Sequence, residues 1–240
     1  MKDIFSRLSI LCPGCGAESF PEIPGSFCPV CLQKLQFFDP RFHCSGCGGE
    51  NDSAMEFCPQ CLVEKPRLWQ QAAAVFAYRS YGRELIRRFK FYNQPELARP
   101  LGILAAEQLE NFIQPRPEVI VPVPLHLFRY LRRSYNQAML LAQTVSTLSG
   151  IPVADIMHRK ISFRKQSALN RSARHRGLQN AFSVKHPGKI AGKRVLLLDD
   201  ILTTGMTLHT VAASLYAAGA AEVSILVIAR VTSHTPFAFK

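Results

Sequence analysis

Residues 195–207 read VLLLDDILTTGMT, and this stretch decides the fold. Its four leading apolar residues, 195–198, are typical of a strand buried in the middle of a sheet. The strand then runs into Asp199 and Asp200, two like charges side by side, and into a loop of threonines around Gly205. An acidic pair gives the end of a buried strand no structural advantage of its own, so it indicates a ligand.

Strand and helix patterns alternate along the chain from residue 72 onward. We expect strands at residues 72–78, 118–124, 151–155, 193–200 and 222–231 and helices at residues 83–91, 95–112, 138–148 and 206–219. This alternation predicts an α/β fold, a parallel sheet with helices on both faces. Ligands of such sheets bind at the carboxyl ends of the strands, which is where the acidic pair lies.

The residues after the acidic pair suit a phosphate group. Backbone N–H groups and the hydroxyls of Thr203, Thr204 and Thr207 can surround an anion, and Gly205 has no side chain to obstruct it. The helix that begins at Met206 adds a favourable dipole. The carboxylates would repel that phosphate, so they serve a neighbouring group, either sugar hydroxyls or a Mg²⁺ ion that bridges to more phosphate. Ribose 5-phosphate offers both kinds of group.

Positive charge is concentrated in one block of the chain. The formal net charge is +12, yet residues 119–198 hold fourteen Lys and Arg residues and a single acid, Asp155. The rest of the chain is therefore close to neutral. A charge run can be a solvated face, but a block with so little opposite charge favours a polyanionic ligand.

Length and composition exclude several classes of protein. A chain of 240 residues with 48% hydrophobic residues has room for one ordinary domain and a smaller one. No apolar run reaches the roughly 18 residues of a membrane span. The first ten residues, MKDIFSRLSI, lack the apolar stretch of a secretory signal. We therefore expect a soluble, cytoplasmic protein.

All eight cysteines precede residue 62, and all fall in CxxC pairs: Cys12/Cys15, Cys28/Cys31, Cys44/Cys47 and Cys58/Cys61. The two halves repeat, since CPGCGAE and FCPVCL are answered by CSGCGGE and FCPQCL. Four thiolates per half predict two closed, tetrahedral structural zinc sites. A disulfide framework is the alternative, but it belongs to secreted chains.

The tandem repeat favours pairing within each half, Cys12/15/28/31 and Cys44/47/58/61, over an interleaved cross-brace. Such a module has little core of its own, so metal binding would supply its folding free energy. Between Cys12 and Cys61 the cations are Lys34 and Arg41, which indicates a structural or protein-docking role. We expect a double zinc ribbon at residues 1–66 and the α/β domain at residues 67–240.

The stretch 195–207 resembles the phosphoribosyl-pyrophosphate (PRPP) binding motif of type I phosphoribosyltransferases. The resemblance extends over nearly the whole chain to the ComF family, the bacterial competence proteins F. The cysteine-rich head is followed in family order by VPVPLH (121–126), RRSYNQA (132–138), RKISFRKQSALNRSARHRGLQNAF (159–182) and the PRPP motif. Family members commonly carry a Thr a few residues before the Gln of the basic segment, where this chain has SFRKQ. Because of this difference, the resemblance does not decide which of Ser162 and Gln166 contacts the ligand.

The resemblance implies functional residues at matching positions. Asp199 and Asp200 would be catalytic and would bind the ribose 2′- and 3′-hydroxyls, while Thr203, Thr204, Gly205, Met206 and Thr207 would hold the 5′-phosphate. The pyrophosphate loop would lie at Val123, at a place where these enzymes often carry a cis peptide, and Mg²⁺ would accompany PRPP. The other residues expected to bind PRPP are Arg129, in a basic loop that covers the pyrophosphate, and Lys90.

The resemblance also implies a role in natural transformation. Because the acceptor half of a transferase site has no signature here, we favour a protein that handles imported single-stranded DNA and retains the PRPP pocket. Tyr130, Tyr135 and Phe163 could stack on bases, and other DNA-uptake or recombination proteins are expected partners. A salvage-type phosphoribosyltransferase is the alternative, and a PRPP-sensing regulator comes third. The residues expected to bind DNA are Arg132, Arg133, Arg164, Lys165, Arg171, Arg174 and Arg176.

Overall fold

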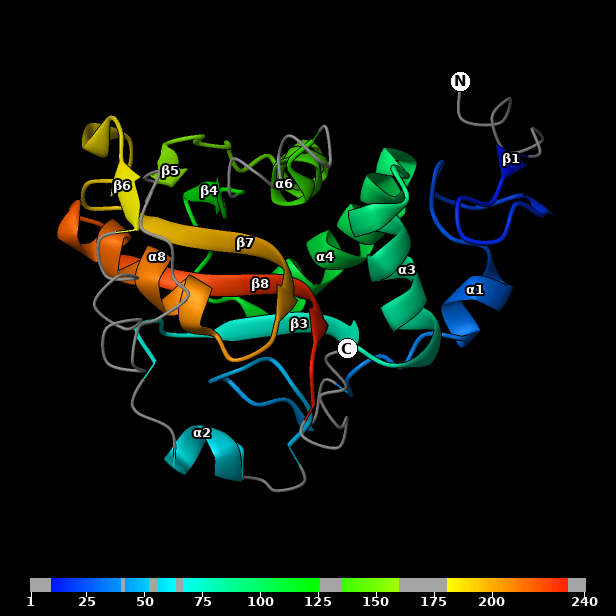
Figure 1. The fold of residues 1–240 in the computed structure, drawn as a ribbon, viewed down its shortest axis with the longest axis horizontal. Helices are drawn as coiled ribbons and strands as arrows, with labels where there is room; N and C mark the ends of the chain where they lie inside the picture. The colour runs from blue at the N-terminus through cyan, green and yellow to red at the C-terminus, as the bar shows by residue number, and fades with distance from the viewer. Residues whose placement is uncertain are drawn as a thin grey trace, which may run out of the picture.

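A parallel sheet forms the centre of the molecule (Figure 1). The computed structural model describes residues 10–39, 42–51, 56–63, 67–125, 135–159 and 181–232. The strands run in the order β3 (Ala72–Ala77), β8 (Glu222–Arg230), β7 (Arg194–Leu202) and β4 (Val119–Pro122). All three neighbouring pairs are parallel. The predicted α/β class is therefore confirmed.

Helices cover both faces of the sheet. The main helices are α3 (Ser80–Phe91), α4 (Ala98–Phe112), α6 (Gln137–Ser149) and α8 (Met206–Ala217), with short 3₁₀ turns η3 (Pro95–Leu97) and η4 (Pro187–Lys189). The step from β3 to β4 crosses the sheet in the opposite direction to the step from β7 to β8. Parallel crossovers are right-handed in nearly all proteins, and this rule places α4 and α8 on opposite faces. α6 packs against α4.

The expected strand at 151–155 is only a single bridge. Val153 pairs with Ile120 of β4 in parallel, and the N–H of Ile120 donates to the carbonyl of Pro152 at 2.9 Å. The return bond comes from the N–H of Ala154, which donates to Ile120 O at 2.8 Å. Pro152 and Pro122 have no N–H with which to extend the ladder on either side. The prediction of a full strand was wrong, although its position at the edge of the sheet is occupied.

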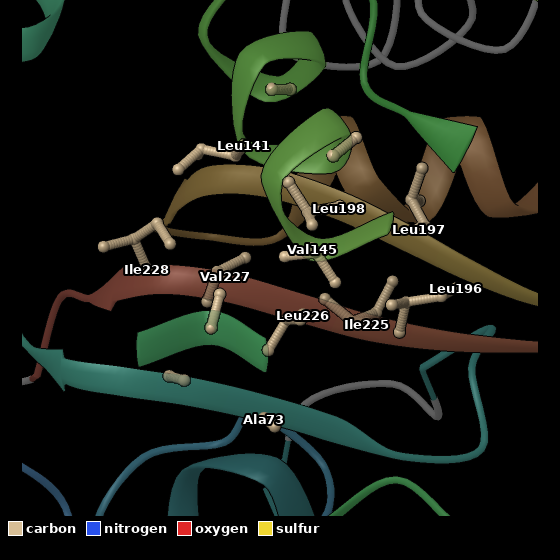
Figure 2. Packing of buried hydrophobic residues seen from close by; sticks show 14 of the residues in the cluster. Ala73, Leu141, Val145, Leu196, Leu197, Leu198, Ile225, Leu226, Val227 and Ile228 are labelled. Carbon is tan, nitrogen blue, oxygen red and sulfur yellow. The ribbon is translucent and has the colours of Figure 1, made fainter. Parts of the chain in front are cut away.

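The core is built from continuous apolar runs in the two central strands. Figure 2 labels Leu197 and Leu198 of β7, Leu226 of β8 and Val145 of α6 among the residues of this core. All four side chains are fully buried. Strands covered on both faces need such uninterrupted runs. Among the described residues no helix has the length and apolar character that a membrane crossing needs.

A small hairpin brackets the most basic part of the chain. β5 (Met157–Arg159) pairs antiparallel with β6 (Phe182–Val184). The guanidinium of Arg159 lies 5.3 Å above the ring of Phe182, and α8 packs against β6. Both ends of the basic segment are therefore attached beside the sheet.

The cysteine-rich head covers the outer edge of β3. It contains β1 (Ile10–Leu11), β2 (Glu18–Ser19), α1 (Pro29–Gln33) and α2 (Pro59–Val63). The N–H of Ala72 donates to Ser45 O at 2.8 Å, and that of Ala77 donates to Gln36 O at 2.9 Å. Gly48 also forms a parallel bridge with Ala73. The backbone groups of this edge strand are thus satisfied by the head rather than exposed to solvent.

Candidate functional site

Two clusters of four thiols form in the head. The first cysteine cluster contains Cys12, Cys15, Cys28 and Cys31, and the second contains Cys44, Cys47, Cys58 and Cys61; the sulfur atoms of each lie within 4.8 Å of one another. The preferred pairing within halves is therefore confirmed, and the cross-brace is excluded. Backbone N–H groups point at the sulfurs, with Cys28 N 3.3 Å from Cys12 Sγ and Cys58 N 3.2 Å from Cys44 Sγ.

The spacing of the sulfur atoms fits zinc. A tetrahedral site with Zn–S bonds of about 2.3 Å places its sulfurs about 3.8 Å apart. The separations are 3.8 Å for Cys12 and Cys31 and 3.9 Å for Cys47 and Cys58. A disulfide needs about 2.05 Å, and all eight cysteines are free thiols. All four ligand positions in each cluster are cysteines, so the clusters suit a structural ion.

We expect about two zinc ions per chain in freshly prepared, reduced protein, measured by elemental analysis. Replacing Cys44 and Cys47 with serine should leave one ion, and the matched change at Cys12 and Cys15 should leave the other. Protein that is folded and reduced but holds no zinc would contradict the assignment.

The acidic pair, Asp199 and Asp200, lies near the carboxyl end of β7. Asp200 is buried, with 5% of its surface exposed, and Asp199 is half-buried. The N–H of Asp200 donates to Oδ1 of Asp199 at 2.8 Å. This contact orients the Asp199 carboxylate, and the strand brings both acids to the ligand-binding edge of the sheet.

Lys90 joins the acidic pair from the last turn of α3. Its Nζ lies 2.7 Å from Oδ1 of Asp200, and both side chains are largely buried. A buried carboxylate needs such a partner, because desolvation disfavours an isolated charge. Lys90 was predicted as a phosphate ligand; the structure places it in the site, with its ammonium group paired to an acid.

Asp199 is the less compensated member of the pair. Burial and the neighbouring charge of Asp200 raise the pKa of Asp199 from its ordinary 3.8 to about 7, although Lys90 acts in the opposite direction. One proton can therefore be gained or lost at this site near neutral pH.

The threonine loop, residues 203–207, follows β7 directly. Thr203, Thr204 and Thr207 are exposed. Gly205 is the N-cap of α8 with a φ of 78°, a left-handed conformation that favours glycine. The N–H of Met206 lies 3.5 Å from Oγ1 of Thr204. The loop thus presents hydroxyls and the start of a helix to solvent, as a phosphate cradle requires.

Val123 lies beside the acidic pair at the end of β4. Its N–H donates to Leu198 O at 2.9 Å, and its carbonyl accepts from Nδ2 of Asn136 at 3.3 Å. The peptide bonds before Pro122 and Pro124 are trans, because Gln114–Pro115 is the cis bond of the described chain. The cis peptide that family analogy implied at this loop is therefore absent.

The RRSYNQA motif contributes a support that sequence reasoning missed. Oη of Tyr135 donates to Phe89 O at 2.6 Å, and Nε2 of the buried Gln137 approaches the same carbonyl at 3.4 Å. Phe89 immediately precedes Lys90. These contacts fix the end of α3 next to the acidic pair, and they favour a structural role for Tyr135 over the base-stacking role expected for it.

The remaining predicted ligand-binding residues lie outside the described residues. They are Arg129, Tyr130, Arg132, Arg133, Phe163, Arg164, Lys165, Arg171, Arg174 and Arg176. Their roles stay predictions. The parts of the chain that the structure describes next to these residues are Val123, which follows β4, and the β5–β6 hairpin.

Comparison with known proteins identifies the family. The chain is 34% identical to competence protein F of Haemophilus influenzae over 209 residues, which is 85% of this chain and 90% of the relative. The chain belongs to the competence protein F family. Within this family it is also 30% identical to the DNA utilization protein YhgH of Escherichia coli K12, over 78% of this chain and 89% of the relative.

Part of this family member also matches a domain model. Residues 145–237 match the family model for the phosphoribosyl transferase domain. Among solved structures, the glutamine PRPP amidotransferase of Bacillus subtilis aligns with 58% of this chain and 30% of its own, at 19% identity and a TM-score of 0.42. The residues matched by the domain model include β7, the acidic pair, the threonine loop and α8.

We expect ligand binding through ribose hydroxyls to strengthen as pH rises through about 7. The reason is that the ionised carboxylate of Asp199 accepts hydrogen bonds from hydroxyls, and its pKa is raised to about 7. Replacing Asp200 with asparagine removes the neighbouring charge, so the pKa of Asp199 should fall. Carboxyl ¹³C NMR of both proteins measures the midpoints directly. An Asp199 midpoint near 4 in the unsubstituted protein would contradict the prediction.

Proposed function

We propose that the protein acts in the uptake and use of DNA, binding single-stranded DNA through its basic segment and a phosphoribosyl group at the acidic pair. The ligand of the pocket is PRPP with Mg²⁺ or a phosphorylated DNA terminus. Relatives called competence protein F and DNA utilization protein support the cellular role. The observation that carries the pocket is the acidic pair placed directly before the threonine loop.

The geometry of this pocket supports a phosphorylated ribose. Asp199 and Asp200 offer carboxylates for vicinal hydroxyls, and the threonine loop offers N–H groups and hydroxyls for the 5′-phosphate. Lys90 neutralises Asp200, which limits the repulsion between the acids and an incoming anion. With PRPP, a Mg²⁺ ion held by pyrophosphate and the carboxylate oxygens would neutralise the remaining negative charge.

The distribution of charge supports the nucleic acid. Residues 119–198 hold all of the chain's excess of positive charge, and the described hairpin attaches both ends of the basic segment beside the sheet. A cationic segment next to a phosphate pocket can follow a DNA backbone toward that pocket. PRPP and DNA would then compete.

A phosphoribosyltransferase is the second candidate. The match to the phosphoribosyl transferase domain model favours it, and the donor half of the reaction has its residues. In that reaction Asp199 and Asp200 would hold the ribose while positive charge develops on it. The two candidates differ in whether PRPP is consumed.

One experiment separates the candidates. Purified protein is incubated with PRPP and Mg²⁺ while pyrophosphate release is followed, with a panel of nucleobases and with single-stranded DNA. Our proposal expects PRPP binding without multiple turnovers, and displacement of a labelled oligonucleotide by PRPP. Repeated turnover with a base would establish the enzyme instead, and absence of binding to both ligands would overturn both candidates.

A further inference from the structure

Trp69 connects the second cysteine cluster to the threonine loop. Its Nε1 donates to Gly46 O at 3.0 Å, between the ligands Cys44 and Cys47. Its Cη2 lies 3.3 Å from the position that a Cβ would take on Gly205. The indole is buried, with 7% of its surface exposed. One rigid ring therefore contacts both the metal-binding turn and the N-cap of α8.

Arg67 makes a second connection on the same side. Its Cζ lies 5.1 Å from the centre of the Trp69 ring, and its side chain hydrogen-bonds Cys61. Its Nη1 lies 2.6 Å from the Cβ position of Gly205. A side chain at residue 205 would have to displace the guanidinium of Arg67 and adopt a left-handed backbone, so both the contact and the backbone favour glycine there.

Arg230, the last residue of β8, makes a third connection. It is 4% exposed, and its Nη1 donates to Thr203 O at 2.8 Å and to Leu202 O at 3.3 Å. At its other end, a Cβ on Gly49 would lie 3.3 Å from Cγ of Arg230 and 3.5 Å from Sγ of Cys47. The stem of Arg230 thus lies near a cysteine of the second cluster, while its guanidinium holds the carbonyls at the junction of β7 and the threonine loop.

Arg230 and the metal-loaded second cluster carry opposite charges. Four thiolates and one Zn²⁺ carry a net charge of −2, and a buried guanidinium is stabilised beside such a group. Without the metal, neutral thiols would not compensate Arg230, whose Nε has no hydrogen-bond partner among the described residues. The loaded second cluster therefore holds Arg230 in the position from which it orients the threonine loop.

Within the described part of the chain, the first cysteine cluster contacts α3 instead of the threonine loop. Oη of Tyr81 donates to Sγ of Cys31 at 3.1 Å, and Nη1 of Arg88 donates to Gly14 O at 2.6 Å. Both partners belong to α3, not to the threonine loop. The two clusters thus have matching ligands but different neighbours, which provides an internal comparison.

We propose that the metal-loaded second cluster positions the threonine loop through Arg230, Arg67 and Trp69, so that metal binding and phosphoribosyl binding strengthen each other. The inference rests on the proposed function, because it takes the loop to bind the phosphate. Such coupling is reciprocal: a ligand that prefers the positioned loop must also retain the metal at the second cluster. Typical couplings change affinity by about 5–150-fold, and we expect about tenfold.

The test measures zinc release in the full chain, with ribose 5-phosphate as the probe. Zinc transfer to a chromophoric chelator is followed with and without the probe. In Cys15→Ser, which retains an intact second cluster, the probe should slow release about tenfold. In Cys61→Ser, which retains the first cluster, the probe should leave release unchanged. In the unsubstituted protein, one of the two ions should be protected.

Arg230→Lys tests the connection without touching a metal ligand. Lysine keeps the charge but loses the planar guanidinium, so ribose 5-phosphate affinity should fall about tenfold while two zinc ions remain. The matched control is Arg194→Lys, the same change at the start of β7, which should bind normally. Trp69 is the only tryptophan of the chain, so its fluorescence reports probe binding in both variants.

The outcomes distinguish the two proposals. If ribose 5-phosphate binds the unsubstituted protein but leaves zinc release from Cys15→Ser unchanged, the coupling is overturned and the proposed function stands. Equal binding by Arg230→Lys and Arg194→Lys would also overturn the coupling. If neither ribose 5-phosphate nor PRPP binds the unsubstituted protein, the proposed pocket and the coupling fall together.

Discussion

Replacing Asp199 and Asp200 together with alanine should weaken PRPP binding in the presence of Mg²⁺ by at least about 100-fold, since hydrogen bonds to charged groups contribute about 1.5–3 kcal/mol each. The largest part of the loss comes from the ribose hydroxyls, which lose both acceptors. The change also leaves the ammonium of Lys90 without the carboxylate that lies 2.7 Å away. Isothermal titration calorimetry measures the affinities directly.

Two controls sharpen this result. Asp199→Asn with Asp200→Asn keeps the size of both side chains and should still lose most of the affinity, because neutral amides accept weaker hydrogen bonds. Glu107→Ala removes an exposed acid in the C-terminal half of α4 and should bind as the unsubstituted protein does. Equal affinity for the unsubstituted protein and the double alanine variant would refute a role for the acidic pair in binding.

Single-stranded DNA binding should depend steeply on salt. A footprint of four or five phosphates gives a log–log slope of about −3, so affinity should fall about 60-fold between 50 and 200 mM salt. Replacing Arg171, Arg174 and Arg176 with alanine should flatten the slope by about two units, because each contact that is lost no longer releases its counterions when DNA binds. Fluorescence anisotropy with a labelled oligonucleotide measures both slopes.

The control variant for this prediction loses the same three positive charges at positions outside the basic segment. Arg83, Arg87 and Arg116 lie on the described surface outside the basic segment, and replacing all three with alanine should leave the slope near −3. If both triple variants flatten the slope equally, net charge alone drives binding. Unchanged anisotropy of the unsubstituted protein at low salt would end the DNA proposal and favour the transferase.

The central strands of the sheet were predictable because the apolar residues that define them are consecutive in the sequence. Strands buried on both faces need continuous apolar runs, and 193–200 and 222–231 have them, so the structure reproduces both to within two residues at either end. The pairing of the cysteines was predictable from the tandem repeat. The strand at 151–155 was expected from its apolar residues, but Pro152 and Pro122 have no N–H with which to extend the pairing beyond one bridge.

The surroundings of the site were not predictable to the same degree. Lys90 meets Asp200 only because Tyr135 and Gln137 hold the end of α3, and none of these contacts has a periodic signature. The contacts of Arg230 with the threonine loop have no such signature either, because the sequence indicates only that Arg230 lies near the end of a strand. Long-range contacts between single side chains depend on the completed fold, and a sequence pattern reports only neighbours along the chain.

The covering of β3 by the head has a consequence for synthesis on the ribosome. The head is translated before β3, whereas β8, the strand that pairs with the other edge of β3, is the last strand of the described chain. A head that has already bound its metal can occupy one edge of the nascent strand while the ribosome completes the other half of the sheet. Zinc supply would then govern how much newly made chain escapes aggregation, before any ligand is present.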